Sequence, residues 1–380
     1  MAKIIYVNII PGLIWVDIPA IGLKLMCGSP ADSVKHLTKK GLIHSTQLNG
    51  VTFDTGPNAI LLSDIMLQNG QFANLSEFPV LQMLYKQGMM IPGHPNNSGE
   101  KPLLVGTQAQ IDAQLNYIYR GNYGLTTKEE LLETGMSEEE ADMYMAIKLY
   151  FAFGNIQEST KLLDTTVINH HKTEIKSGAF IQRKSLNNFE LTFEDETVQI
   201  DLNLPTNTLY DVPYPLGFYN IKRDYFSIVH SGDGDGWDIN RPCMGSIIMY
   251  QGKVYLIDAG PNTLTSLLSL GISINEIEGI FHTHAHDDHF AGLTTLMRSD
   301  HRIKYYASAP VIAATVQKLS SLLSVNKETI AHYFELIALE SDRWNNIAGL
   351  EVKPIFSPHP AETNIFFFRT LWSDGYKTYA

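Results

Sequence analysis

The sequence predicts an α/β protein. From about residue 165 to 260, short runs rich in β-branched and aromatic residues are separated by turns, as in "TVQIDLNL" and "KVYLIDAG". After residue 260, strand-length apolar runs alternate with longer helical patterns, which is typical of α/β folds. Before residue 165 the patterns are mixed, so an α+β N-terminal region is expected to precede the α/β region.

The elements follow in chain order. Residues 1–50 alternate short apolar runs with Gly and Pro and predict strands and turns. Thr127 with Glu130, and Ser137 with Glu140, have capping-box spacing and predict two helices, "KEELLET" and "EEEADMYMAIKLYFAF". Beyond residue 260, "HFAGLTTLMRSD", "VIAATVQKLSSLL" and "KETIAHYFELIAL" predict helices, and "IKYYASA", "LEVKPIFS" and "NIFFFRTLW" predict strands. The linker candidate "LYDVPYPLGFYN" divides the chain into regions 1–215 and 216–380, and no motif indicates a role for the first.

Composition excludes several classes of partner. The chain has 380 residues and a formal net charge of −12, which argues against a broad basic surface for nucleic acid. No run approaches the roughly 20 apolar residues of a membrane span, so no membrane partner is expected. Cys27 and Cys243 are the only cysteines, which fits a reducing compartment, and a cytoplasmic location is expected. The oligomeric state is not indicated.

The stretch "HTHAHDDHF", residues 282–290, indicates a metal site. In an extended segment His284 and His286 point to the same side and can share one ion. Asp288 and His289 come where the chain turns into the next helix and can reach a second ion. Imidazole and carboxylate suit zinc, with iron and manganese as alternatives.

His284-x-His286-x-Asp288-His289 resembles the H-x-H-x-D-H signature of the metallo-β-lactamase superfamily, and "KVYLIDAGPN" resembles the strand that precedes it there. The resemblance implies an αββα sandwich for residues 216–380. It also implies a further metal ligand, His359 in "SPHPAETN", a supporting carboxylate, Asp258, and a hydrogen-bonding role for His282. Trp237 and Asp238, in a loop that borders the active site of the family, are candidate substrate contacts.

The implied function is a metal-dependent hydrolase that uses a metal-activated hydroxide on an ester, thioester or phosphodiester of a small molecule. One or two zinc ions are expected, and Asp288 would also orient the nucleophile. The alternatives are a di-iron protein that binds oxygen or passes electrons, and a non-catalytic sensory module. The chain also resembles bacterial members that continue into a cyclic-nucleotide-binding domain. Because the bridging Asp and last His of the family would follow "GYKTYA", the domain is expected to be truncated at its C-terminus.

One internal similarity suggests a repeat. "FDTGPNAIL", residues 53–61, resembles "IDAGPNTL", residues 257–264. A decayed copy of the C-terminal fold would explain it, and so would the coincidence of a common turn.

Overall fold

The computed structural model describes residues 2–380, which form two compact units. The first unit contains the chain up to Ile118, Glu158–Pro215 and Gly236–Asn240, and the second contains Tyr119–Gln157, Leu216–Asp235 and Arg241–Ala380. One change of unit falls between Pro215 and Leu216, inside the linker candidate. Residues 119–157, expected in the N-terminal region, instead belong to the second unit.

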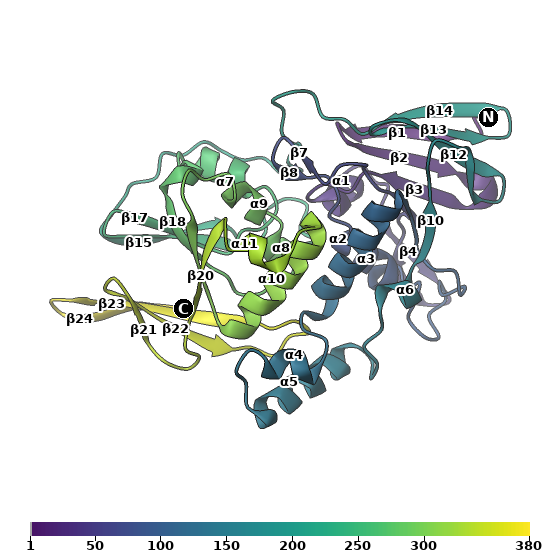
Figure 1. Cartoon of the computed structure of the whole chain (residues 1–380). Coiled ribbons are helices and arrows are strands. Elements are labelled where there is room, and N and C mark those ends of the chain that lie inside the picture. Colours follow the sequence, from purple (N-terminus) through teal and green to yellow (C-terminus); the bar gives the residue numbers. More distant parts are fainter. Residues whose placement is uncertain (1) are drawn as a thin grey trace. The chain divides into compact units, whose positions relative to one another are not determined.

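The first unit is built on two sheets (Figure 1). The strands of its six-stranded sheet are, in spatial order, β1 (Ile5–Ile10), β2 (Leu13–Ile18), β3 (Leu23–Cys27), β6 (Ala59–Leu61), β9 (Leu103–Gly106) and β10 (Asp164–Val167). The four-stranded antiparallel sheet contains β11 (Thr173–Lys176), β12 (Ala179–Ser185), β13 (Asn188–Phe193) and β14 (Glu196–Asp201). Two small hairpins are β4 (Ser45–Leu48) with β5 (Val51–Asp54), and β7 (Leu67–Gln68) with β8 (Gln71–Phe72).

The helices of the first unit are η1 (Pro19–Ile21), α1 (Ser33–Lys39), α2 (Glu77–Leu81), the π-helical η2 (Gln82–Lys86), α3 (Gln108–Tyr123) and α6 (Ser159–Leu162). The last residues of α3, after Ile118, belong to the second unit. Alternate residues of the two sheets meet in one buried cluster, in which Leu25 and Leu61 of the larger sheet pack with Phe189 and Leu191 of the smaller one. Burial of this apolar surface holds the two sheets face to face.

The second unit also has two sheets. The strands of its six-stranded sheet are β15 (Phe226–Gly232), β16 (Gly245–Tyr250), β17 (Lys253–Ile257), β18 (Ile277–Phe281), β19 (Ile303–Ala307) and β20 (Phe334–Ala338). The four-stranded antiparallel sheet contains β21 (Asn345–Ile347), β22 (Leu350–Phe356), β23 (Asn364–Trp372) and β24 (Gly375–Tyr379). The helices are α4 (Lys128–Leu132), α5 (Glu138–Phe151), α7 (Thr263–Ser269), η3 (Ile274–Glu276), α8 (Asp287–Phe290), α9 (Leu293–Leu296), α10 (Ala309–Leu323) and α11 (Lys327–Ile330).

Neighbouring residues of β19 show how the layers of the second unit are arranged. Tyr306 joins the buried cluster between the sheets, where Phe281 packs against Phe366 and Phe368. Tyr305 points to the opposite side, and its hydroxyl donates to Thr315 of α10 over 2.9 Å. The larger sheet is therefore covered by helices on one face and by the second sheet on the other. The expected α/β fold class, with its metallo-β-lactamase sandwich of two sheets, is confirmed.

Most of the expected elements of the second unit occur where the sequence predicts them. The strand patterns of residues 226–257 and 350–372 form strands, and both capping positions begin helices, with a complete capping box at Ser137. The single helix expected over residues 327–339 is wrong: it is a short α11 followed by β20. Phe334–Ala338 pairs in parallel with β19, so sheet hydrogen bonds outweigh local helical preference there.

The two units share one topology. In each larger sheet, two antiparallel pairings are followed by three parallel ones. Gly28 N donates to Leu61 O over 2.8 Å, as Asp258 N donates to Phe281 O over 2.9 Å. Gly28 and Asp258 also share a left-handed backbone, with φ of +77° and +65°. The fold is therefore repeated, and the segment equivalent to "IDAGPNT" begins at Cys27.

The pairing suggested by "FDTGPNAIL" is wrong, because Asp54 ends the separate β4–β5 hairpin. Among the described residues, no helix is both long enough and apolar enough to cross a membrane.

Candidate metal centre

The histidine motif lies at the edge of the larger sheet of the second unit. β18 ends at Phe281, and the motif follows as an extended segment up to the start of α8 at Asp287. β17 pairs in parallel with β18, so the carboxyl ends of both strands are at the same edge. Asp258 directly follows β17 and therefore lies beside the motif.

Three imidazoles form a first group. Ligand atoms of His284, His286 and His359 all lie within 4.8 Å of one another. His359 comes from the loop between β22 and β23, and its Nε2 is 2.9 Å from Nδ1 of His286. The fold therefore brings together two residues of the motif and one that is far away in the sequence.

A second group shares one member with the first. Ligand atoms of His284, Asp288 and His289 also lie within 4.8 Å of one another. Oδ2 of Asp288 is 3.5 Å from Nε2 of His289. No further group of this kind occurs among residues 2–380. An uncharged His284 has one lone pair and can bind one cation, while Asp288 and His289 beside it can contribute ligands to a neighbouring cation.

Burial prepares the first group for a cation. It holds the pKa values of His284 and His286 well below the usual range and lowers the pKa of His359 to about 4. Repulsion between the neighbouring imidazoles acts in the same direction. At neutral pH these rings are uncharged and have a lone pair to donate, which is the form that binds zinc. The donor set of the described residues therefore fits a metal ion.

Asp258 orients the second group. Its Oδ1 accepts from Thr283 N over 2.7 Å, and its Oδ2 accepts from Thr283 Oγ1 over 2.8 Å and lies 2.7 Å from His289 Nδ1. Burial alone would raise the pKa of Asp258, but His289 lowers it below its usual value. Burial alone would lower the pKa of His289, but Asp258 and Asp288 raise it to about 9. Because Nδ1 of His289 contacts Asp258, Nε2 on the other side of the ring faces Asp288.

His282 lies behind the motif. Its side chain is fully buried, its Nδ1 contacts the Tyr305 hydroxyl, and its Nε2 is 3.2 Å from the carbonyl oxygen of His289. Burial lowers the pKa of His282 to about 4. The ring belongs to neither group of ligand atoms and holds the backbone of the motif.

Lys318 is a supporting residue that the sequence analysis missed. Its buried Nζ donates to Ala285 O over 2.5 Å and to Asp287 Oδ1 over 2.9 Å. These contacts tie α10 to the loop that carries the histidines. The sequence gives no signal for this contact, because the burial of Asp287, which makes a partner necessary, is visible only in the structure.

The two candidate substrate contacts are grouped with the other unit. Trp237 and Asp238 belong to a segment grouped with the first unit, where the Trp237 ring lies 4.7 Å from that of Phe78 and 4.6 Å from Lys86 Nζ. Their role in substrate binding stays a prediction.

Asp288, the candidate residue for orienting the nucleophile, is half-buried, and burial raises the pKa of its carboxyl group.

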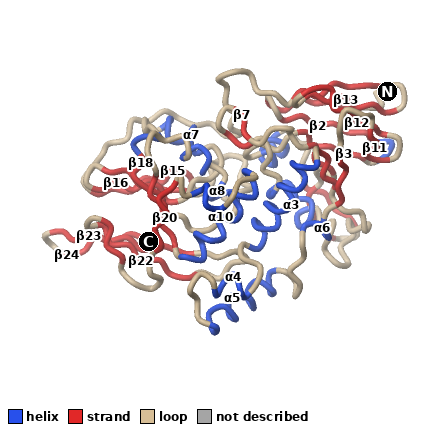
Figure 2. Tube along the Cα trace, in the orientation of Figure 1, coloured by secondary structure: helices blue, strands red, loops and turns tan. Residues whose placement is uncertain are grey.

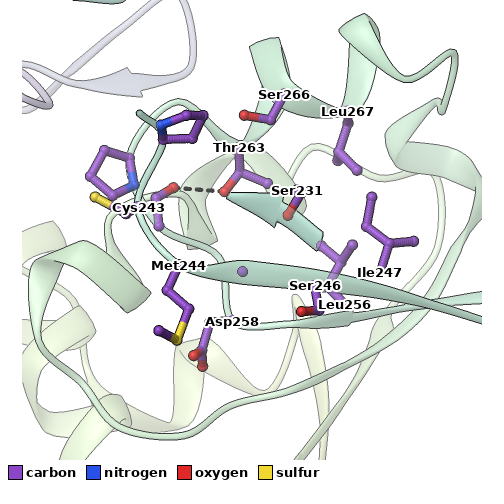
Figure 3. Close-up of a pocket in the computed structure, with 14 residues that line it drawn as sticks. Ser231, Cys243, Met244, Ser246, Ile247, Leu256, Asp258, Thr263, Ser266 and Leu267 are labelled. Carbon is purple, nitrogen blue, oxygen red and sulfur yellow. Dashed lines mark hydrogen bonds between the residues drawn. The ribbon is translucent and has the colours of Figure 1, made fainter. Parts of the chain in front are cut away.

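A small cavity lies beside Asp258 (Figure 3). Its volume of about 30 Å³ admits roughly one or two water molecules and no organic substrate. Cys243, Met244, Ser246 and Thr263 are among its lining residues, and Thr263 Oγ1 donates to Gly260 O over 2.6 Å. Cys243 is a buried cysteine of this wall and forms no disulfide.

The equivalent region of the first unit has other residues. Asp64 follows β6 there, and it pairs with Arg183 over 2.8 Å. The loop that carries His359 between β22 and β23 corresponds to the short turn at Leu186 and Asn187 between β12 and β13. The repeat has thus kept the fold and replaced the metal-binding residues.

The sandwich and the paired ligand groups define the second unit as a metallo-β-lactamase fold with a candidate metal centre, and the resemblance to this superfamily is confirmed. Residues 226–375, less than half of the chain, match the family model described as "Anti-Pycsar protein Apyc1". The bacterial subgroup with a C-terminal cyclic-nucleotide-binding domain stays a prediction.

Individual relatives and solved structures are similar to part of this chain. Ribonuclease Z of Thermoplasma acidophilum is 27% identical over 137 residues, which are 35% of this chain and 44% of the relative. The cGMP-dependent 3',5'-cGMP phosphodiesterase A of Dictyostelium discoideum is 20% identical over 141 residues, 37% of this chain and 16% of the relative. A solved diphosphatase of the PhnP family has 23% identity and a TM-score of 0.30, and the match covers 38% of this chain and 61% of that one. The chain therefore spans less than half the length of these curated relatives.

Proposed function

We propose that the second unit is a metal-dependent hydrolase of phosphodiesters. The observation that carries this proposal is the cluster in which the imidazoles of His284, His286 and His359 lie next to Asp288 and His289. Of the esters, thioesters and phosphodiesters that such a site can cleave, phosphodiesters are favoured because two of the similar proteins are named ribonuclease and cyclic-nucleotide phosphodiesterase. Bound zinc would supply a nucleophile from water and polarise a phosphoryl oxygen.

The residues of this chain have separate roles in the proposal. His284, His286 and His359 would hold one ion, and Asp288 and His289 would contribute ligands to a second. As water adds to phosphorus and the ester bond breaks, Asp288 would orient the water and take up its proton, which finally reaches the leaving oxygen. Asp258 keeps a proton on Nδ1 of His289, so that Nε2 stays available as a ligand.

A substrate of nucleotide size fits the surroundings better than a long RNA. The net charge of −12 disfavours an extended polyanion, whereas two cations can neutralise one phosphate group. The exposed ring of Phe151 lies 6.5 Å from the His359 ring, and Tyr150, which is 81% exposed, adjoins it. Aromatic faces beside a phosphate site can stack a nucleobase. The ribonuclease Z relatives favour RNA instead, so RNA is the second candidate substrate.

The metal and the compartment are also proposals. Zinc is favoured over iron and manganese by the imidazole-rich ligands. Cys27 and Cys243 form no disulfide, which supports a reducing compartment such as the cytoplasm.

The test is a substrate panel with the full chain loaded with zinc: 3',5'-cyclic nucleotides, bis(p-nitrophenyl) phosphate, a short RNA and a thioester. We expect cyclic nucleotides to be opened by the parent, and His284→Ala to lose activity at least 100-fold because it removes one of the three imidazoles that would hold the first ion. Cleavage of RNA alone would replace the substrate proposal. A zinc-loaded parent that cleaves none of the four would refute the hydrolase.

A further inference from the structure

Residues 119–157 serve the unit that contains the histidines, although in chain order they lie within the other repeat. They connect α3 to β10 of the first unit, the position that the short α11 segment occupies between α10 and β20 in the second. After the end of α3 at Tyr123, α4 and α5 are the labelled helices of this segment (Figure 2). Leu125, Leu131 and Ala141 pack with Ala314 of α10 in a buried cluster. The segment is therefore part of the core of the second unit.

A buried ion pair connects this segment to the loop of His359. Nζ of Lys148, on α5, lies 2.7 Å from Oε1 of Glu362, and the two side chains are 1% and 0% exposed. Nζ also donates to Tyr123 O over 2.5 Å, and Oε2 of Glu362 accepts from Leu125 N over 3.1 Å. The pair thus reaches the backbone at both sides of Gly124.

Gly124 shows how closely Glu362 is held. Its φ is +62°, and a Cβ at this position would lie 2.0 Å from Oε2 of Glu362. Glycine alone leaves room for the carboxylate, since any side chain would meet it.

The same lysine holds the backbone next to His359. Nζ of Lys148 donates to the carbonyl oxygen of Pro360 over 3.0 Å. The loop closes on itself through Ser357 N, which donates to Thr363 O over 3.1 Å, and the Tyr144 ring lies 4.7 Å from that of Phe356 at its start. Lys148 therefore contacts either the loop that carries His359, at Pro360 and Glu362, or the backbone at Tyr123 that packs against this loop.

We propose that Lys148 and Glu362 are positioning residues that hold His359 against His284 and His286 for the first metal ion. This inference rests on the metal binding of the proposed function. Burying two charges costs desolvation that an apolar pair of similar volume would avoid, so stability alone is a poor reason for the pair. An apolar pair has no donor for the carbonyl oxygen of Pro360 in the ligand loop, whereas Lys148 has one.

The test is the double variant K148M/E362L, which removes both charges and leaves none unpaired. The matched control is R369M/E351L, which removes the ion pair of 2.9 Å across β22 and β23, the strands that the loop connects. Zinc affinity is measured by chelator competition, cobalt coordination by visible absorbance, and stability by urea unfolding. We expect K148M/E362L to bind the first ion 10–100-fold more weakly and to lose tetrahedral cobalt absorbance, as His359→Ala does, and the control to change by less than about twofold.

The isosteric Glu362→Gln is a second variant, in case the double variant does not fold, and a weakening of several-fold is expected there. Zinc affinity equal to that of the parent in a folded K148M/E362L or Glu362→Gln would overturn the positioning role. A parent that binds metal without cleaving any ester would refute the hydrolase and leave this inference standing. A parent that binds no metal would refute both the hydrolase and the positioning role of Lys148 and Glu362.

Discussion

Asp258→Asn tests the arrangement of the second ligand group. The carboxylate lies 2.7 Å from His289 Nδ1 and accepts from both Thr283 N and Thr283 Oγ1. An asparagine has one acceptor oxygen, which can serve Thr283 N, so its amide nitrogen would face His289. Nδ1 must then accept instead of donate, and the ring proton moves to Nε2, the nitrogen that the second ion requires.

The magnitude follows from that change of tautomer. Loss of a partner behind a metal-bound imidazole typically weakens metal affinity 10–100-fold, which is about 1.4–2.8 kcal/mol. A second effect concerns protons. In the metal-free parent His289 is protonated at pH 7, because its pKa is raised to about 9. Zinc binding must therefore release this proton, and without the charge of Asp258 the pKa falls and less proton is released.

The assay is zinc titration in two buffers of different ionisation enthalpy, which separates affinity from proton release. Asp300→Asn is the matched control, since Asp300 also contacts a histidine, Nδ1 of His301 over 2.9 Å, on the exposed surface of the same unit. We expect weaker binding and reduced proton release in Asp258→Asn and neither change in Asp300→Asn. Unchanged affinity and proton release in a folded Asp258→Asn would refute the orienting role of Asp258.

Three further predictions concern stability, pH and substrate binding. Phe281→Ala, in the buried aromatic cluster between the sheets, should lower the free energy of unfolding by about 3–5 kcal/mol in urea; a loss below 1 kcal/mol would contradict the packing. The free energy of unfolding of the metal-free chain should fall as the pH falls from about 6.5 towards 4. In this range His284, His286 and His359 take up protons in the unfolded chain but not yet in the folded chain, where their pKa values are lowered. Urea midpoints that do not move over this range would contradict the lowered pKa values. Phe151→Ala should raise KM for a cyclic nucleotide about 5–100-fold with little change in kcat, the equivalent of about 1–3 kcal/mol of stacking; an equal KM in a steady-state assay would remove Phe151 from the substrate site.

Local patterns predicted a large part of the second unit. Alternating apolar residues predicted strands such as β17 and β22, and the capping box of Ser137 predicted the start of α5, because each signal acts over a few residues. The spacing of His284 and His286 likewise indicated that both could face one ion. The same local reasoning failed at Phe334–Ala338, where pairing with a strand distant in the sequence decided the structure.

The sequence by itself determined the chemistry of the candidate centre, since the ligand types and their spacing are written in one short segment, and family resemblance added His359. Only the tertiary structure decided what holds that centre together: the Lys148–Glu362 pair joins residues that are more than two hundred positions apart. It also decided that the N-terminal half repeats the fold, because the repeat is preserved in strand order and backbone geometry and not in side chains. The physical reason is that a fold depends on which surfaces can be buried together, and many sequences meet that requirement, whereas a metal site depends on particular atoms.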